Sequence, residues 1–135
     1  MDRYAMTGLL KGKVAVVTGG SKGIGYSIAE RFTKEGAKVV VSSRNKEELE
    51  AAANMLSCDH FAVDVSDSKS VLSLKEWLID THGSLDILVN CAGAVRYDGI
   101  MEATEEDWDF QISVNLTGTF LMCNKLAPIM NDGGA

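Results

Sequence analysis

The chain has 135 residues, of which 46% are hydrophobic and 24% charged, as expected for one globular domain or part of one. Its net charge of −6 argues against binding to nucleic acid or to an anionic membrane, and no apolar stretch approaches the ~20 residues of a membrane helix. Its three cysteines are widely separated without metal-ligand spacing, so we expect no metal site and a reduced, cytoplasmic setting.

Short apolar segments alternate with helical patterns along the whole chain. Asn45 and Thr104 have side chains suited to cap helices, and Gly36 and Gly83 are suited to end them. Strands separated by helices imply a parallel sheet covered on both faces, an α/β Rossmann-type doubly wound fold with strand order 3-2-1-4. In chain order the pattern predicts strands at 13–18, 38–42, 60–63 and 85–89, and helices at 24–35, 46–55, from 66 or 67 to 81, and from 104 to about 129.

Three spaced glycines follow the first strand, in the run Thr-Gly-Gly-Ser-Lys-Gly-Ile-Gly. Gly19 allows a tight turn, and Gly23 and Gly25 let the backbone and the next helix approach a diphosphate closely. The alternative is a tight strand–helix turn without a ligand. The spacing within this strand and helix context predicts a dinucleotide site, whose residues here are Thr18, Gly19, Ser21, Lys22, Gly23, Ile24 and Gly25.

Four features together resemble the N-terminal half of a short-chain dehydrogenase/reductase. They are the glycine motif, Asp64-Val65 after the third strand, Asn90-Cys91-Ala92-Gly93 after the fourth, and Asn115 in the long helix. The resemblance covers residues 10 to 128, and the sequence around the motifs is similar to that of NADPH-dependent carbonyl and tropinone reductases. It implies that residues 1–135 are an NAD(P)-binding domain of an oxidoreductase that transfers hydride between NADP(H) and a small-molecule carbonyl or alcohol.

The resemblance also implies roles for individual residues. Asp64, with Val65, would lie at the adenine, although a turn or helix cap is the alternative for this aspartate. Asn90, Ala92 and Gly93 would let the cofactor lie close to the backbone. Cys91 stands where the family often has a second asparagine, and we interpret it as a small buried filler.

Asn115 is the single catalytic assignment that the resemblance makes in this chain. In the family this asparagine holds a kinked helix and a water that relays protons to the catalytic lysine. The alternative is an ordinary polar helix residue. An asparagine between Val114 and Leu116 is unfavourable in a helix unless it has a partner, which favours the family role.

Charge at the end of the second strand predicts the choice of cofactor. Members that prefer NAD usually carry an acidic residue there, which binds the ribose hydroxyls. This chain has Ser43 followed by Arg44, and Lys22 lies within the glycine loop. Both cations would attract a 2′-phosphate, so NADP(H) is favoured over NAD(H). Solvated surface cations are the alternative.

The family's catalytic serine and Tyr-x-x-x-Lys motif are not found in the chain. None of its tyrosines, Tyr4, Tyr26 and Tyr97, has a lysine four residues later. We therefore expect an N-terminal fragment that is truncated after the fourth strand and long helix, and that is inactive alone. Its strand at 85–89 would have an unpaired edge, and its helix at 104–129 would support a homo-oligomer. Two alternatives are a non-catalytic dinucleotide-binding module and an interaction protein that pairs with a complete homologue.

Overall fold

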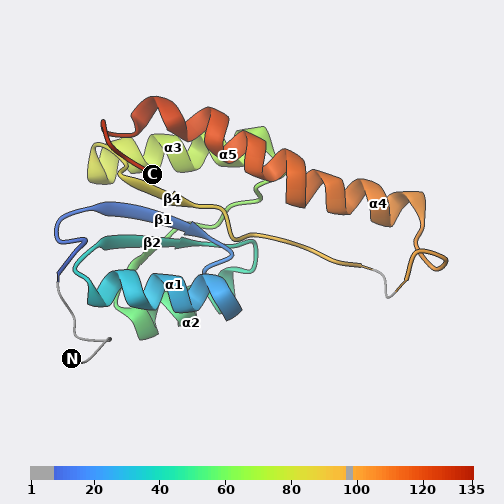
Figure 1. The fold of residues 1–135 in the computed structure, drawn as a ribbon, viewed down its shortest axis with the longest axis horizontal. Helices are drawn as coiled ribbons and strands as arrows, with labels where there is room; N and C mark the ends of the chain where they lie inside the picture. Colours follow the sequence, from blue (N-terminus) through green and yellow to red (C-terminus); the bar gives the residue numbers. More distant parts are fainter. Residues whose placement is uncertain (1–7, 97–98) are drawn as a thin grey trace.

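The structure, a computed structural model, describes residues 8–96 and 99–135 and contains a four-stranded sheet in the order β3-β2-β1-β4 (Figure 1). Every pairing is parallel, and Val16 in the central strand lies between Val40 and Leu88. The predicted fold class and strand order are confirmed. The strands are β1 (Val14–Thr18), β2 (Lys38–Ser42), β3 (Asp59–His60) and β4 (Ile87–Val89).

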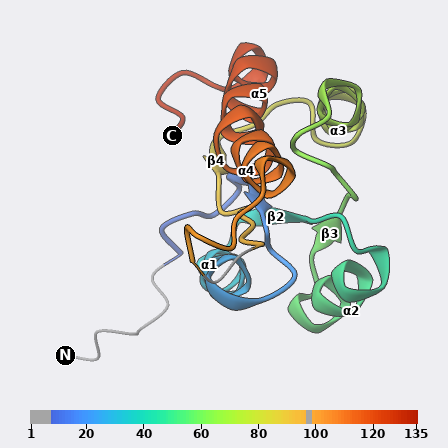
Figure 2. The ribbon, with the colours of Figure 1, turned by 90° about the vertical axis from the view of Figure 1, so that its right-hand side faces the viewer.

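Helices cover both faces of this sheet, with α1 (Gly23–Lys34) and α2 (Lys46–Leu56) on one face and α3 (Ser68–His82) and α5 (Gly118–Leu126) on the other (Figures 1 and 2). The valine-rich strands suit this arrangement because successive side chains point to opposite faces. Val17 packs in the core beneath α1 and α2, while Val16 belongs to the core beneath α3 and α5.

Side-chain caps fix where the helices begin. The Asn45 side-chain oxygen accepts a hydrogen bond from the backbone N–H of Glu48 at 3.2 Å, so α2 begins at Lys46 as predicted. Thr104 and Asp107 form a reciprocal capping box at the start of α4 (Glu105–Ile112). These local signals explain why the predicted helix starts lie close to the observed ones.

The long C-terminal helix is continuous but not uniform. After α4 comes a π-helical turn, η1 (Ser113–Thr117), then α5 and a short 3₁₀ turn, η2 (Ala127–Ile129). The π-helical turn contains Asn115, where the family resemblance implied a kink. Such widened turns occur often at functional sites.

The bounds of three predicted strands differ from the observed ones, and β1 begins at Val14 rather than Lys13. β3 covers only Asp59–His60 rather than 60–63, since its partner β2 ends at Ser42 and pairs with it only through Val40 and Val41. The chain beyond it still donates from the Val63 N–H to the Ser43 carbonyl oxygen at 3.0 Å, and then turns away from the sheet. β4 begins at Ile87 rather than Leu85.

The expected unpaired edge at 85–89 is also wrong in part. Residues 130–135 lie along this edge, and Leu85 forms an isolated parallel bridge with Met130. The Asn131 N–H donates to the Leu85 carbonyl oxygen at 2.8 Å, and the Leu88 N–H donates to the Ala135 carbonyl oxygen at 2.8 Å. Backbone groups on this side of the sheet are thus paired within the chain.

Asp86 joins this C-terminal segment to the central strand. Its carboxylate accepts hydrogen bonds from the Val14 N–H and from the Asn131 side-chain amide, both at 2.8 Å. The Asn131 amide, followed by the Val14 N–H, lowers the pKa of this carboxyl below its ordinary value.

The helices within residues 8–96 and 99–135 include none with the length and apolar character that a membrane span requires.

Candidate functional site

A cavity of about 680 Å³ opens at the carboxyl ends of β1, β2 and β4. Strand order reverses at β1, and such switch points are where doubly wound sheets bind ligands. The predicted residues that line it are Gly19, Ser21, Lys22, Ile24, Gly25, Ser43, Arg44, Asp64, Val65, Ala92 and Gly93. Sequence reasoning did not place Ser42, Asn45, Glu48, Val63, Cys91 and Val114 there, although they also line it.

The glycine loop is packed too tightly for a side chain at Gly19 and Gly25. A Cβ on Gly25 would lie 2.2 Å from the Gly19 carbonyl oxygen, and one on Gly19 would lie 2.9 Å from the Cys91 carbonyl oxygen. Gly23 has a φ of +59° with nothing near its missing Cβ, so backbone conformation rather than space favours glycine there. At these glycines the loop therefore brings bare backbone, together with the start of α1, to the cavity.

Thr18 lies beneath the cavity rather than on its wall. It is 1% exposed, and its hydroxyl oxygen accepts hydrogen bonds from the N–H groups of Cys91 and Ala92, both at 3.0 Å. The same hydroxyl donates to the Val89 carbonyl oxygen at 3.3 Å. Thr18 thus fastens the segment after β4 to the end of β1 and positions the wall that Ala92 forms.

Asn115 has a comparable positioning role from the helix side. Its side chain makes two hydrogen bonds to the backbone of Ala94. A Cβ on the neighbouring Gly93 would lie 3.5 Å from its Oδ1 atom. Asn115 does not line the cavity itself, but it has the partner that a helical asparagine needs.

Asn90, a predicted cofactor residue, also does not line the cavity. Its side-chain amide lies 3.4 Å from the Sγ atom of Cys123 on α5. Cys91, interpreted as a buried filler, is half-buried and lines the cavity instead.

Cys58 is not among the residues that line the cavity. Burial, with a smaller contribution from the Asp59 charge, raises the pKa of its thiol to about 11.

Asp64 closes a turn at the edge of the cavity. Its Oδ1 atom accepts hydrogen bonds from the Ser66 N–H at 3.0 Å and the Ser66 hydroxyl at 2.6 Å. Its own N–H donates to the Ser70 hydroxyl at 3.0 Å. These contacts are those of the turn cap considered as the alternative, although Asp64 still lines the cavity beside Val65.

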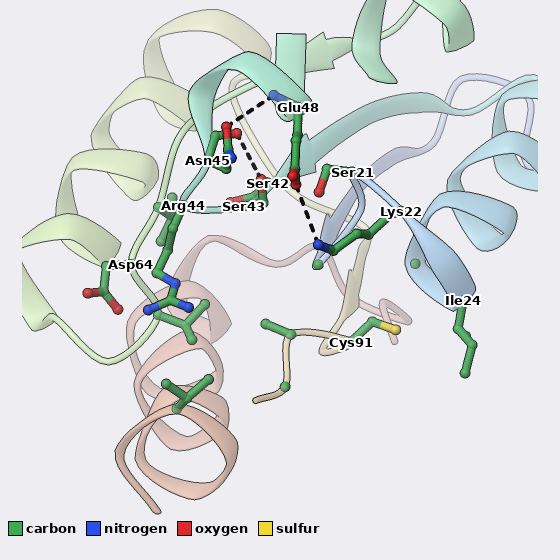
Figure 3. Close-up of a pocket in the computed structure, with 17 residues that line it drawn as sticks. Ser21, Lys22, Ile24, Ser42, Ser43, Arg44, Asn45, Glu48, Asp64 and Cys91 are labelled. Carbon is green, nitrogen blue, oxygen red and sulfur yellow. Dashed lines mark hydrogen bonds and ion pairs between the residues drawn. The ribbon is translucent and has the colours of Figure 1, made fainter. Parts of the chain in front are cut away.

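The two cations near the end of β2 point to different neighbours. The Nζ atom of Lys22 lies 3.6 Å from Glu48 Oε2, while the Arg44 side chain extends away from that pair toward Asp64 (Figure 3). The guanidinium carbon of Arg44 lies 5.5 Å from the centroid of the Phe110 ring on α4. The cavity therefore has a cation on each side, of which Lys22 contacts Glu48 and Arg44 lies near the Phe110 ring.

One buried polar atom lacks a partner at this end of the cavity. The Ser42 hydroxyl, at the last position of β2, is buried and meets no hydrogen-bond partner among the described residues. A buried hydroxyl without a partner costs about 1–3 kcal/mol. A polar ligand group in the cavity would remove this cost.

Comparison with known proteins identifies the family. The short chain dehydrogenase family model matches residues 13–135. D-threitol dehydrogenase of Mycolicibacterium smegmatis is 40% identical over 130 residues, which are 93% of this chain and 50% of that protein. An uncharacterized oxidoreductase of Staphylococcus aureus strain USA300 is 42% identical over 125 residues, covering 90% of this chain and 54% of that protein.

A solved structure agrees with this result. The Pseudomonas aeruginosa RhlG/NADP active-site complex superposes with a TM-score of 0.87 at 30% identity, over 96% of this chain and 52% of that one. The chain belongs to the short-chain dehydrogenase family. It spans about half the length of the curated relatives it matches.

Proposed function

We propose that this chain is the dinucleotide-binding domain of an oxidoreductase that transfers hydride between NADP(H) and a carbonyl or alcohol. The observation that carries the proposal is the cavity at the switch point, walled by a glycine loop in which Gly19 and Gly25 leave no room for a Cβ atom. Its volume of about 680 Å³ suits a small-molecule site. The NADP complex named for RhlG supports a nicotinamide dinucleotide as the ligand.

The residues present fit such a cofactor. The loop from Gly19 to Gly25 and the start of α1 would hold the diphosphate, since backbone N–H groups and the helix dipole favour anions. Asp64 and Val65 would border the adenine, and Ala92 and Gly93 would leave the backbone open to the cofactor. When bound, the cofactor would supply the hydride.

We infer a preference for NADP(H) from the charges at the ribose end. Ser43 rather than an acidic residue follows β2, and Lys22 and Arg44 both line the cavity. The Ser42 hydroxyl, which lacks a partner among the described residues, adds a donor at the same end. A phosphate would gain charge-assisted hydrogen bonds from such a group of donors.

We further propose that this chain alone does not complete the reaction. The sequence contains no Tyr-x-x-x-Lys, and Tyr97, the nearest tyrosine to the segment after β4, lies outside the described residues. Asn115 would contribute by positioning that segment and the π-helical turn. The residues that exchange a proton with the substrate would then be supplied by other parts of a longer protein.

Association through the long helix and a cytoplasmic location are also proposals. Trp108 is 56% exposed and Phe120 is 61% exposed, and Leu116 between them is exposed as well. Apolar side chains gathered on one helix support a surface shared with a second copy. The free cysteines support a reducing compartment.

Calorimetric titration with NADP⁺ and NAD⁺ tests the proposed function. The protein should bind at least one of them, and Gly25→Val should abolish binding because its side chain would enter the Gly19 backbone. The thermal unfolding of the variant must be checked, because the same clash opposes folding. A folded wild-type protein that binds neither dinucleotide would refute the proposal.

A further inference from the structure

Glu48 lines the cavity at its ribose end, although no sequence motif singled it out. It lies in the first turn of α2, where the Asn45 side chain accepts from its backbone N–H at 3.2 Å. The Ser43 hydroxyl donates to the Asn45 carbonyl oxygen at 3.4 Å and so ties this turn to the residue after β2. The backbone of Glu48 is therefore held in a fixed position beside the cavity.

The carboxylate of Glu48 reaches across to the glycine loop. Its Oε2 atom lies 3.6 Å from Lys22 Nζ, and the two side chains are 49% and 80% exposed (Figure 3). An exposed ion pair of this kind is weak and is screened by salt. A stronger anion that enters the cavity can therefore exchange with the carboxylate.

A 2′-phosphate is such an anion, because a phosphate monoester carries close to two negative charges near pH 7. We propose that Glu48 is a specificity-determining residue that competes with this phosphate for Lys22. This inference rests on the proposed function. Glu48 thereby reduces the preference for NADP(H) over NAD(H). Arg44 is the cation that this competition does not involve, since its guanidinium lies toward Phe110.

The two cofactors would meet Glu48 differently. With NADP(H), Lys22 leaves Glu48 for the phosphate, and the freed carboxylate stays close to a group of the same charge. With NAD(H), the ion pair persists, and Glu48 adds an acceptor for ribose hydroxyls. Glu48→Gln would free Lys22 for the phosphate, which should tighten NADP⁺ binding by about 3- to 10-fold at this hydrated site.

Glu48→Gln tests this, with Glu47→Gln as the matched control. Glu47 is an exposed residue of the same helical turn, it does not line the cavity, and its replacement changes the net charge equally. Calorimetric titration at low salt should show tighter NADP⁺ binding for Glu48→Gln, by about 3- to 10-fold. NAD⁺ binding should stay the same or weaken. The control should change either affinity less than about 2-fold.

The Lys22→Met background shows whether Glu48 acts through the lysine. The gain from Glu48→Gln should shrink in that background, and it should also shrink at high salt. Equal gains in Glu48→Gln and Glu47→Gln would overturn the proposal, as would an undiminished gain in Lys22→Met. If the wild type binds dinucleotide and Glu48→Gln changes nothing, this inference alone fails. If the wild type binds neither, the proposed function fails as well.

Discussion

The side-chain amide of Asn115 pairs with both backbone groups of Ala94. Its Oδ1 atom accepts from the Ala94 N–H at 2.8 Å, and its Nδ2 atom donates to the Ala94 carbonyl oxygen at 2.9 Å. Through these two hydrogen bonds, the amide connects the segment after β4 to the π-helical turn of the long helix. This side chain thus links the segment that follows the cavity wall to the helix beside it.

We expect Asn115→Ala to destabilise the fold by about 1 kcal/mol and to weaken dinucleotide binding. The destabilisation is modest because Asn115 is exposed, so water can form hydrogen bonds with the Ala94 backbone groups after the amide is removed. Urea unfolding and calorimetric titration measure the two effects. Asn54→Ala, at an exposed asparagine within α2, is the control and should leave binding unchanged. An Asn115→Ala protein with wild-type affinity would contradict the positioning role.

We expect Arg44→Asp to reverse the preference between the cofactors, because attraction for the 2′-phosphate becomes repulsion. The new carboxylate would also accept hydrogen bonds from the ribose hydroxyls of NAD(H). Titration of both proteins with NADP⁺ and NAD⁺ gives the ratio of affinities. Lys46→Asp makes the same charge change outside the cavity lining and should leave that ratio nearly unchanged. Equal affinity for both cofactors in the wild type would count against the idea.

Asp86 should make stability depend on pH in acid. Its folded-state pKa is lowered, first by the Asn131 amide and then by the Val14 N–H. The stabilisation is therefore present above the unfolded pKa of about 3.9 and is lost as pH falls through the folded value. Urea unfolding between pH 2.5 and 7 should show this loss, and Asp86→Asn should flatten it. If Asp86→Asn lost stability in acid as the wild type does, other carboxylates would be the cause and the prediction for Asp86 would be wrong.

The chain alone should show no measurable dehydrogenase activity. Loss of a general acid/base lowers the rate by roughly 10²–10⁴, and the missing alignment of the nicotinamide adds to this. The assay is NADPH consumption with a panel of ketones and aldehydes, using protein whose mass is verified. Turnover that follows the 135-residue species and disappears in Asn115→Ala would contradict this expectation. Tyr97 would then be the first residue to replace.

Features that depend on neighbouring residues could be predicted from the sequence. The Asn45 and Thr104 caps, the glycine loop and the alternation of strands and helices are local patterns, and they gave the strand order and most of the cavity lining. The glycine at position 25 could be explained from spacing alone, although its closest neighbour proved to be the Gly19 carbonyl oxygen.

Features that depend on how the elements pack could not be predicted. Glu48 resembles any acidic residue in the first turn of a helix, and its contact with Lys22 follows only from the placement of α2 beside the glycine loop. The pairing of Asn131 with Leu85 depends on where the long helix ends. The contact between Arg44 and the Phe110 ring joins residues that are distant in sequence.

The buried hydroxyl of Thr18 makes two particular amides informative about the whole cavity. The N–H groups of Cys91 and Ala92 are bonded to that hydroxyl, so their exchange with deuterium requires those hydrogen bonds to open. Their exchange with deuterium would thus report on the integrity of the floor of the cavity. A ligand seated above them should slow that exchange without touching either proton.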